Sequence, residues 1–191
     1  MITYSFEGKV LPTTYDTFIE NVLNALFDIE PDPSLDILIR VSEAIEAQEG
    51  VAGLCSGDEH EITIDVATHF ELECGESCEY QPHELASNIA HELVHARQFA
   101  RNQINDVDYV WKRNGESINC EHVEYRDTPW EVEAYGLEVI LTDLFWGKIM
   151  VDIILGILFF TAFTAALYGA VLTVRDKQMQ WEQRKDREKD L

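Results

Sequence analysis

Two histidines and a glutamate lie close together in a segment with helical periodicity. His91, Glu92 and His95 form the pattern His-Glu-x-x-His. On an α-helix the two histidines lie about 40° apart, so both imidazoles can reach a single Zn²⁺. Glu92 follows the first histidine and could act as general base on the water that such a zinc ion activates. The pattern therefore predicts a zinc site suited to hydrolysis.

The helix predicted over residues 83–102 has an apolar face and a polar face. With His91 placed at 0°, the apolar residues fall between about 120° and 200°; they are Leu85, Ile89, Leu93, Ala96 and Ala100. Polar residues gather around the histidines on the other side, namely Glu84, Asn88, His95, Gln98 and Asn102. A solvated helix surface would show the same division, but the pair of histidines favours the wall of a cleft.

A zinc site with an open position needs a third protein ligand. The second long helix, predicted over residues 128–145, contains Glu131 and Glu133, which lie about 160° apart around its axis. Glu133 shares its face with apolar residues, namely Trp130, Leu137, Ile140, Leu141 and Leu144, whereas Glu131 lies on the more polar side. A carboxylate on a core face is costly without a compensating cation. We therefore expect Glu133 to bind the zinc; a structural pairing of Glu133 with Arg97 or Arg126 is the alternative.

The two motifs together resemble the gluzincin branch of zinc metallopeptidases. The likeness is closest to small bacterial and phage zincins, in which a HELxHxxQ segment is followed by a P-W-E-x-E-A segment, and it covers residues 83–139. It implies a zincin-like fold, with an active-site helix under a small mixed sheet whose edge strand lines the cleft. It also implies His91, His95 and Glu133 as zinc ligands and Glu92 as general base.

The resemblance implies two further groups of site residues. Residues 61–68 alternate Ile62, Ile64 and Val66 with polar residues, so this segment is expected to be the edge strand that binds an extended peptide. A tyrosine or histidine often stabilises the oxyanion in such families. Tyr125, His122 and Tyr135 are the candidates for that role, and no motif chooses among them.

The remaining patterns predict an α+β domain. A helix is expected over residues 13–29, strands over 35–41, 61–68 and 107–112, and a loop over 113–119, without a βαβ repeat. The four cysteines (Cys55, Cys74, Cys78 and Cys120) are too few for a disulfide scaffold, and their spacing leaves disulfides, free thiols and a zinc knuckle open.

Charge divides the chain into parts of different character. The net charge is -22, and residues 1–147 hold 30 of the 36 acidic residues but only 7 of the 14 basic ones. No Lys/Arg cluster lies in that part, which argues against nucleic acid as the main partner. We therefore expect an acidic domain over residues 1–147, an apolar helix over 148–174 and a charged helical tail over 175–191.

The apolar helix is long enough to cross a membrane. Residues 153–174 contain no charged side chain, and roughly 20 such residues span the hydrocarbon layer. Positive charges after the span favour a cytoplasmic tail, whereas the N-terminus shows no export signal, so the side on which the acidic domain lies stays open.

The expected function is that of a zinc-dependent metallopeptidase with a single C-terminal membrane span, acting on peptides or proteins. A structural or assembly protein is the alternative, in which a zincin-like domain has little peptidase activity and the helix joins copies of the chain, for example in a virus particle. A cytosolic enzyme that uses the apolar helix for oligomerisation is a third interpretation.

Overall fold

The structure is a computed structural model that describes residues 2–27, 34–45, 51–105 and 109–164. The chain divides into two compact units, residues 1–149 and residues 150–191. The first unit contains all strands described below and the helices that pack on them.

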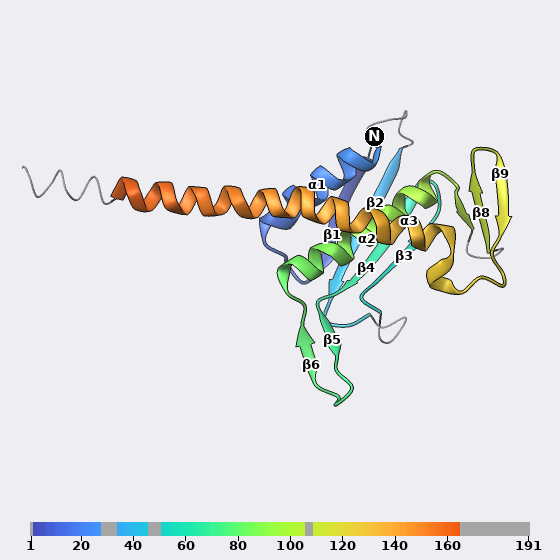
Figure 1. Cartoon of the computed structure of the whole chain (residues 1–191), viewed down its shortest axis with the longest axis horizontal. Helices are drawn as coiled ribbons and strands as arrows, with labels where there is room; N and C mark the ends of the chain where they lie inside the picture. The colour runs from blue at the N-terminus through green and yellow to red at the C-terminus, as the bar shows by residue number, and fades with distance from the viewer. Residues whose placement is uncertain (1, 28–33, 46–50, 106–108, 165–191) are drawn as a thin grey trace, which may run out of the picture. The chain divides into compact units, whose positions relative to one another are not determined.

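A four-stranded sheet in the order β1-β2-β4-β3 organises the first unit (Figure 1). β1 (Ile2–Gly8), β2 (Leu35–Ser42) and β4 (Glu61–Ala67) run parallel, and β3 (Gly53–Gly57) pairs antiparallel with β4. β3 is therefore an edge strand. In β2 the apolar residues Leu35, Ile37, Ile39 and Val41 are buried, while most of the residues between them are exposed. This period of two places one face of the sheet against the core.

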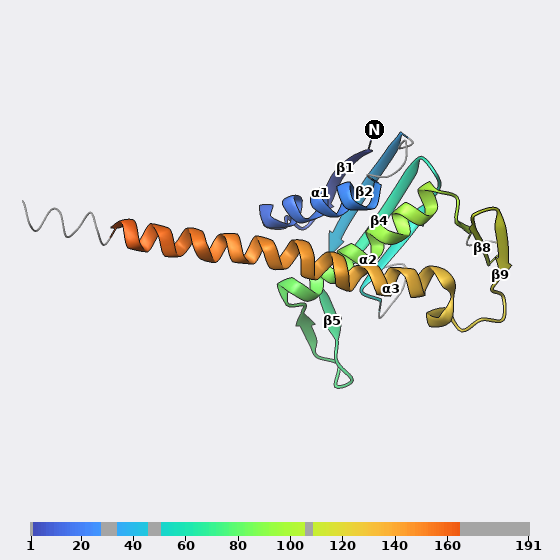
Figure 2. The ribbon, with the colours of Figure 1, turned by 45° about the horizontal axis from the view of Figure 1, so that its top comes forward.

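Helices cover that apolar face (Figures 1 and 2). α1 (Thr13–Phe27) connects the parallel strands β1 and β2, so one βαβ crossover is present. α2 (Pro82–Ala100) packs against α1, α3, β3 and β4, and α3 (Pro129–Leu141) is followed by a π-helical turn at Thr142–Trp146. Side chains from the helices and the sheet form one continuous core, which includes Phe18, Ile39 and Leu93.

Two smaller sheets complete the first unit. β5 (His69–Glu71) and β6 (Ser77–Glu79) form a hairpin, and β7 (Ile104–Asn105), β8 (Val110–Arg113) and β9 (Glu116–Asn119) form a three-stranded sheet. A short 3-10 helix, η1 (Tyr125–Asp127), precedes α3. Cys74 and Cys78 on the first hairpin have free thiols, as does the buried Cys120.

The mixture of helices and strands agrees with the α+β expectation. The structure also confirms, within two residues at each described end, the helices predicted at 13–29 and 83–102 and the strand predicted at 35–41. Two expectations are wrong. Residues 113–119 contain β9 instead of a loop. The segment 61–68 forms β4, but β4 lies between β2 and β3, and Ile62, Ile64 and Val66 are buried in the core instead of lining an edge.

The predicted apolar helix is present. One continuous helix runs from Pro129 to Thr164 and is long and apolar enough to cross a membrane, and only 6% of its most apolar window is buried. In the second unit, its residues 150–164 are all exposed. Positions 165–174 of the predicted span and the tail at 175–191 lie outside the described residues.

Candidate metal centre

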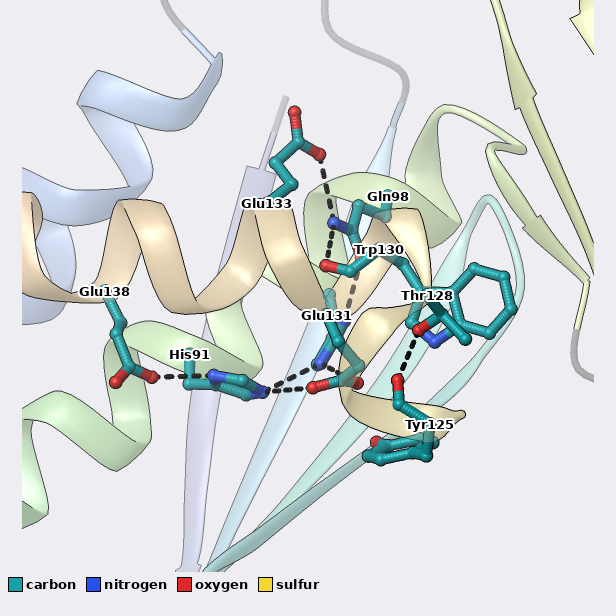
Figure 3. A network of polar contacts seen from close by, with 9 residues as sticks. His91, Gln98, Tyr125, Thr128, Trp130, Glu131, Glu133 and Glu138 are labelled. Carbon is teal, nitrogen blue, oxygen red and sulfur yellow. Dashed lines mark hydrogen bonds and ion pairs between the residues drawn. The ribbon is translucent and has the colours of Figure 1, made fainter. Parts of the chain in front are cut away.

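α2 carries the two histidines of the motif. The helix begins with Pro82 at its first position, and Glu84 Oε2 accepts a hydrogen bond of 2.9 Å from the Gln81 N–H, an arrangement that satisfies one of the free backbone groups at a helix start. The predicted apolar face is confirmed, because Leu85, Ile89, Leu93, Ala96 and Ala100 are all buried. The opposite face carries His91 and His95 toward Glu131 of α3, and Figure 3 shows His91 in this position.

Glu131 on α3 meets both histidines. His91 Nε2 lies 3.3 Å from Glu131 Oε2, and His95 Nε2 lies 3.2 Å from Glu131 Oε1. The two Nε2 atoms are 3.0 Å apart. Among the described residues these three form the group that could hold a metal ion, with one ligand atom from each lying within 4.8 Å of the others.

The burial of Glu131 fits a cation at this position. The side chain is 1% exposed, and both carboxylate oxygens are buried without a hydrogen bond of regular geometry. A buried carboxylate without such partners is costly unless a positive charge compensates it. Burial by itself acts to raise the pKa of Glu131, but the nearby histidines and the Tyr125 hydroxyl hold it below its ordinary value. Two imidazole nitrogens and one carboxylate are a donor set that suits zinc.

Glu92 lies beside this group and against the edge strand. A Cβ atom built on Gly53 of β3 would fall 2.5 Å from Glu92 Oε1, so the glycine allows the strand to approach the carboxylate. Burial raises the pKa of Glu92 to about 7, although the two histidines act to lower it. A carboxyl group with a pKa near neutrality can both accept and return a proton.

A cavity of about 430 Å³ opens next to Glu92, His95 and Glu131. Gly53, Leu54 and Cys55 of β3 line one part of it. Much of the remaining lining is apolar or aromatic and includes Phe99, Ile104, Val123 and Trp130. The cleft-lining strand is thus β3, which corrects the expectation for residues 61–68.

Tyr125 is the oxyanion candidate that lines the cavity. Its backbone carbonyl accepts a hydrogen bond of 2.7 Å from Thr128 Oγ1, which ties η1 to the start of α3. Burial and the contact with Glu131 raise the pKa of its phenol. The Tyr135 ring packs edge-on against His91 with its centroid 4.8 Å away, whereas His122 is exposed and is not one of the residues that line the cavity.

The expectation that Glu133 completes the metal site is wrong in this geometry. Glu133 lies on the other side of α3 from Glu131 (Figure 3). Its Oε1 is 3.0 Å from Arg97 Nη2 and 3.4 Å from Arg113 Nη1. The pairing with Arg97 is the alternative that the sequence left open, and Arg113 adds to it.

The apolar residues of α3 are the reason why its buried face was predicted wrongly from the sequence. Several of them point to solvent, since Val132, Val139 and Ile140 are each more than half exposed. Hydrophobicity marks the core side of a helix only when the solvent side is polar. Because α3 is apolar on both sides, the face around Glu133 looked like the core, while the buried side carries Glu131.

Both histidines have a second partner that the sequence analysis did not identify. Glu138 Oε2 lies 2.6 Å from His91 Nδ1, and Gln98 Oε1 lies 2.8 Å from His95 Nδ1. Burial acts to lower the pKa of His91, but Glu131 and Glu138 together raise it to about 10. Helical spacing could have pointed to both partners. Glu138 lies two turns after Glu131 on α3, and Gln98 lies one turn after His95 on the polar face of α2.

No protein-family model, no curated protein and no solved structure matches this chain.

Proposed function

We propose that this protein is a zinc-dependent metallopeptidase anchored by a C-terminal membrane span. The observation that carries the proposal is the buried group of His91, His95 and Glu131, in which both Glu131 oxygens have no regular hydrogen bond and face the two Nε2 atoms. Glu92 completes a His-Glu-x-x-His arrangement beside the same group. Glu131 replaces Glu133 as the third ligand of the gluzincin-like set.

Each residue has a defined task in this proposal. Zinc, when bound by His91, His95 and Glu131, supplies the Lewis acidity that activates water and polarises a carbonyl. Glu92 accepts the proton of the attacking water and passes it to the leaving amine. Tyr125 lies at the same cavity, where its hydroxyl could donate a hydrogen bond to the carbonyl oxygen of the substrate.

The edge strand and the cavity favour an extended peptide as substrate. Within the part of the chain that the structure describes, β3 pairs with β4 on one side only, so its other edge can pair with a peptide strand by main-chain hydrogen bonds. Leu54, Phe99 and Trp130 in the cavity suit an apolar side chain of that peptide. The exposed and predominantly apolar segment 150–164 supports the membrane span.

The test uses the full chain purified in detergent and loaded with zinc. We expect about one equivalent of bound zinc after dialysis, cleavage of a peptide library, and preference for sites with a bulky apolar residue. Glu92→Gln should retain the zinc and lose hydrolysis. The exposed Glu121→Gln, at the same cavity, is the control and should remain active.

The outcomes separate the proposal from an assembly role. A wild-type protein that retains no zinc would reject the metallopeptidase. Bound zinc without hydrolysis of any library peptide, together with a defined oligomer in detergent, would favour the structural alternative. Full-length protein that stays soluble and monodisperse without detergent would reject the membrane span.

A further inference from the structure

Gln98 lies on α2, one turn after His95, and its buried side chain contacts both His95 and α3. Its side chain is completely buried, and its amide has three partners, one on its own helix α2 and two on α3. Gln98 Oε1 lies 2.8 Å from His95 Nδ1. Gln98 Nε2 donates to the Trp130 carbonyl and to Glu133 Oε2, each at 3.0 Å (Figure 3).

These partners determine which way the amide points. The Trp130 carbonyl and the Glu133 carboxylate can only accept hydrogen bonds, so the NH₂ group of Gln98 must face both of them. The carbonyl oxygen of Gln98 then faces His95 Nδ1. Because this oxygen can only accept, Nδ1 of His95 must carry the proton, and in the neutral ring the lone pair lies on Nε2.

Glu133 holds the amide in this orientation. Its carboxylate is fixed by Arg97 on α2 at 3.0 Å and by Arg113 on β8 at 3.4 Å, so it stays an acceptor for Gln98. His91 differs, because its Nδ1 meets the carboxylate of Glu138 directly at 2.6 Å. The two histidines are thus oriented by different means, one by a carboxylate and the other by an amide that a carboxylate holds.

We propose that Gln98 and Glu133 are positioning residues that set the tautomer of His95 and direct its Nε2 toward the metal. This inference rests on the metal site of the proposed function and gives Glu133 a task at that site without ligation. Partners of this kind, which hold a ligating histidine through its other nitrogen, raise metal affinity in other sites.

The first measurement does not require zinc. In ¹⁵N-histidine-labelled, metal-free full-length protein in detergent, we expect the wild-type His95 ring to show a slowly exchanging Nδ1–H. Gln98→Met has a similar volume but cannot accept this hydrogen bond, so the Nδ1–H signal should disappear or exchange quickly. A wild-type ring that carries its proton only on Nε2 would overturn the proposal, whatever the protein does with zinc.

The second measurement is zinc affinity by competition with a chelator. Gln98→Met should bind zinc about 10- to 100-fold more weakly than the wild type. Gln103→Met, five residues further along the chain, is the matched control, because Gln103 Oε1 has no hydrogen-bond partner. We expect the zinc affinity of this control to stay within about threefold of the wild type, because the loss of a partner that orients a ligand lowers affinity by about 10-fold or more.

A double variant tests the link between the two positioning residues. Gln98→Glu still accepts from His95 but repels Glu133, so this single variant should also bind zinc weakly. Adding Glu133→Gln supplies an NH₂ group that can donate to the new carboxylate, and the double variant should recover part of the lost affinity, because only the Trp130 carbonyl then lacks the donor that Gln98 supplied. Equal affinities of the single and double variants, or an unchanged affinity of Gln98→Met, would overturn the positioning role. Failure of the wild type to bind zinc would instead reject the proposed function.

Discussion

Gly53 and Glu92 approach so closely that a Cβ atom on the glycine would lie 2.5 Å from the carboxylate oxygen Oε1 and 2.6 Å from Cγ. Gly53 begins the edge strand β3, and Glu92 is the proposed general base on α2. The strand that would bind a substrate and the group that would activate water are thus in direct contact, and only a residue without a side chain allows this spacing.

Gly53→Ala should therefore impair hydrolysis while leaving the metal ligands in place. The added methyl group must displace the buried Glu92 side chain or push β3 away from α2, and a small displacement of a catalytic group costs about 100-fold in rate. We expect kcat to fall by about that factor at unchanged zinc content, measured by peptide cleavage and metal analysis. Gly136→Ala, on α3 with open space around it, is the control. Unchanged kcat in Gly53→Ala would show that the contact has no catalytic importance.

Glu131→Gln and Glu133→Gln should differ in their effect on zinc binding. Glu131 lies within 3.3 Å of both Nε2 atoms, so its replacement removes a charged ligand and should weaken affinity by more than about 100-fold, the upper range for loss of an outer partner. Glu133→Gln can still accept from Gln98 and should lose about 10-fold or less. Chelator competition measures both, and a larger loss for Glu133→Gln would contradict the ligand set described above.

The metal-free protein should become less stable as the pH rises from about 4.5 to 7. Burial raises the pKa of Glu92 from 4.5 to about 7, so the folded state binds a proton there that the unfolded state has released. A group with a raised pKa contributes its full stability below its unfolded pKa and loses it as the pH rises through the folded value. The free energy of unfolding should fall by on the order of 3 kcal/mol across this interval.

Glu92→Gln tests the origin of that slope. The amide does not titrate, so denaturant unfolding in the presence of chelator should depend less on pH between 4.5 and 7 than in the wild type. Glu121→Gln changes an exposed carboxylate at the same cavity and should keep the wild-type slope. The titration of Glu92 would not be the cause if Glu92→Gln retained the full slope.

Much of the domain could be predicted because its signals are local. The alternation of Leu35, Ile37, Ile39 and Val41 has the period of a strand with one buried face, and β2 has that form. The polar face of α2 likewise follows from helical spacing alone. The edge position of β3 has no local signal, because it depends on which distant segments pair with each other, and glycines such as those at both of its ends are more typical of loops.

The sequence by itself determined the helix that carries His91, Glu92 and His95, and the division between an acidic domain and an apolar helix. It also placed two glutamates, Glu131 and Glu133, in the second motif. Only the tertiary structure decided that Glu131 faces the histidines, that Glu133 pairs with arginines and holds Gln98, and that Gly53 touches Glu92. The physical reason is that the orientation of α3 depends on its packing against α2. Its sequence is apolar on both sides, so hydrophobic periodicity could not show which glutamate is turned inward.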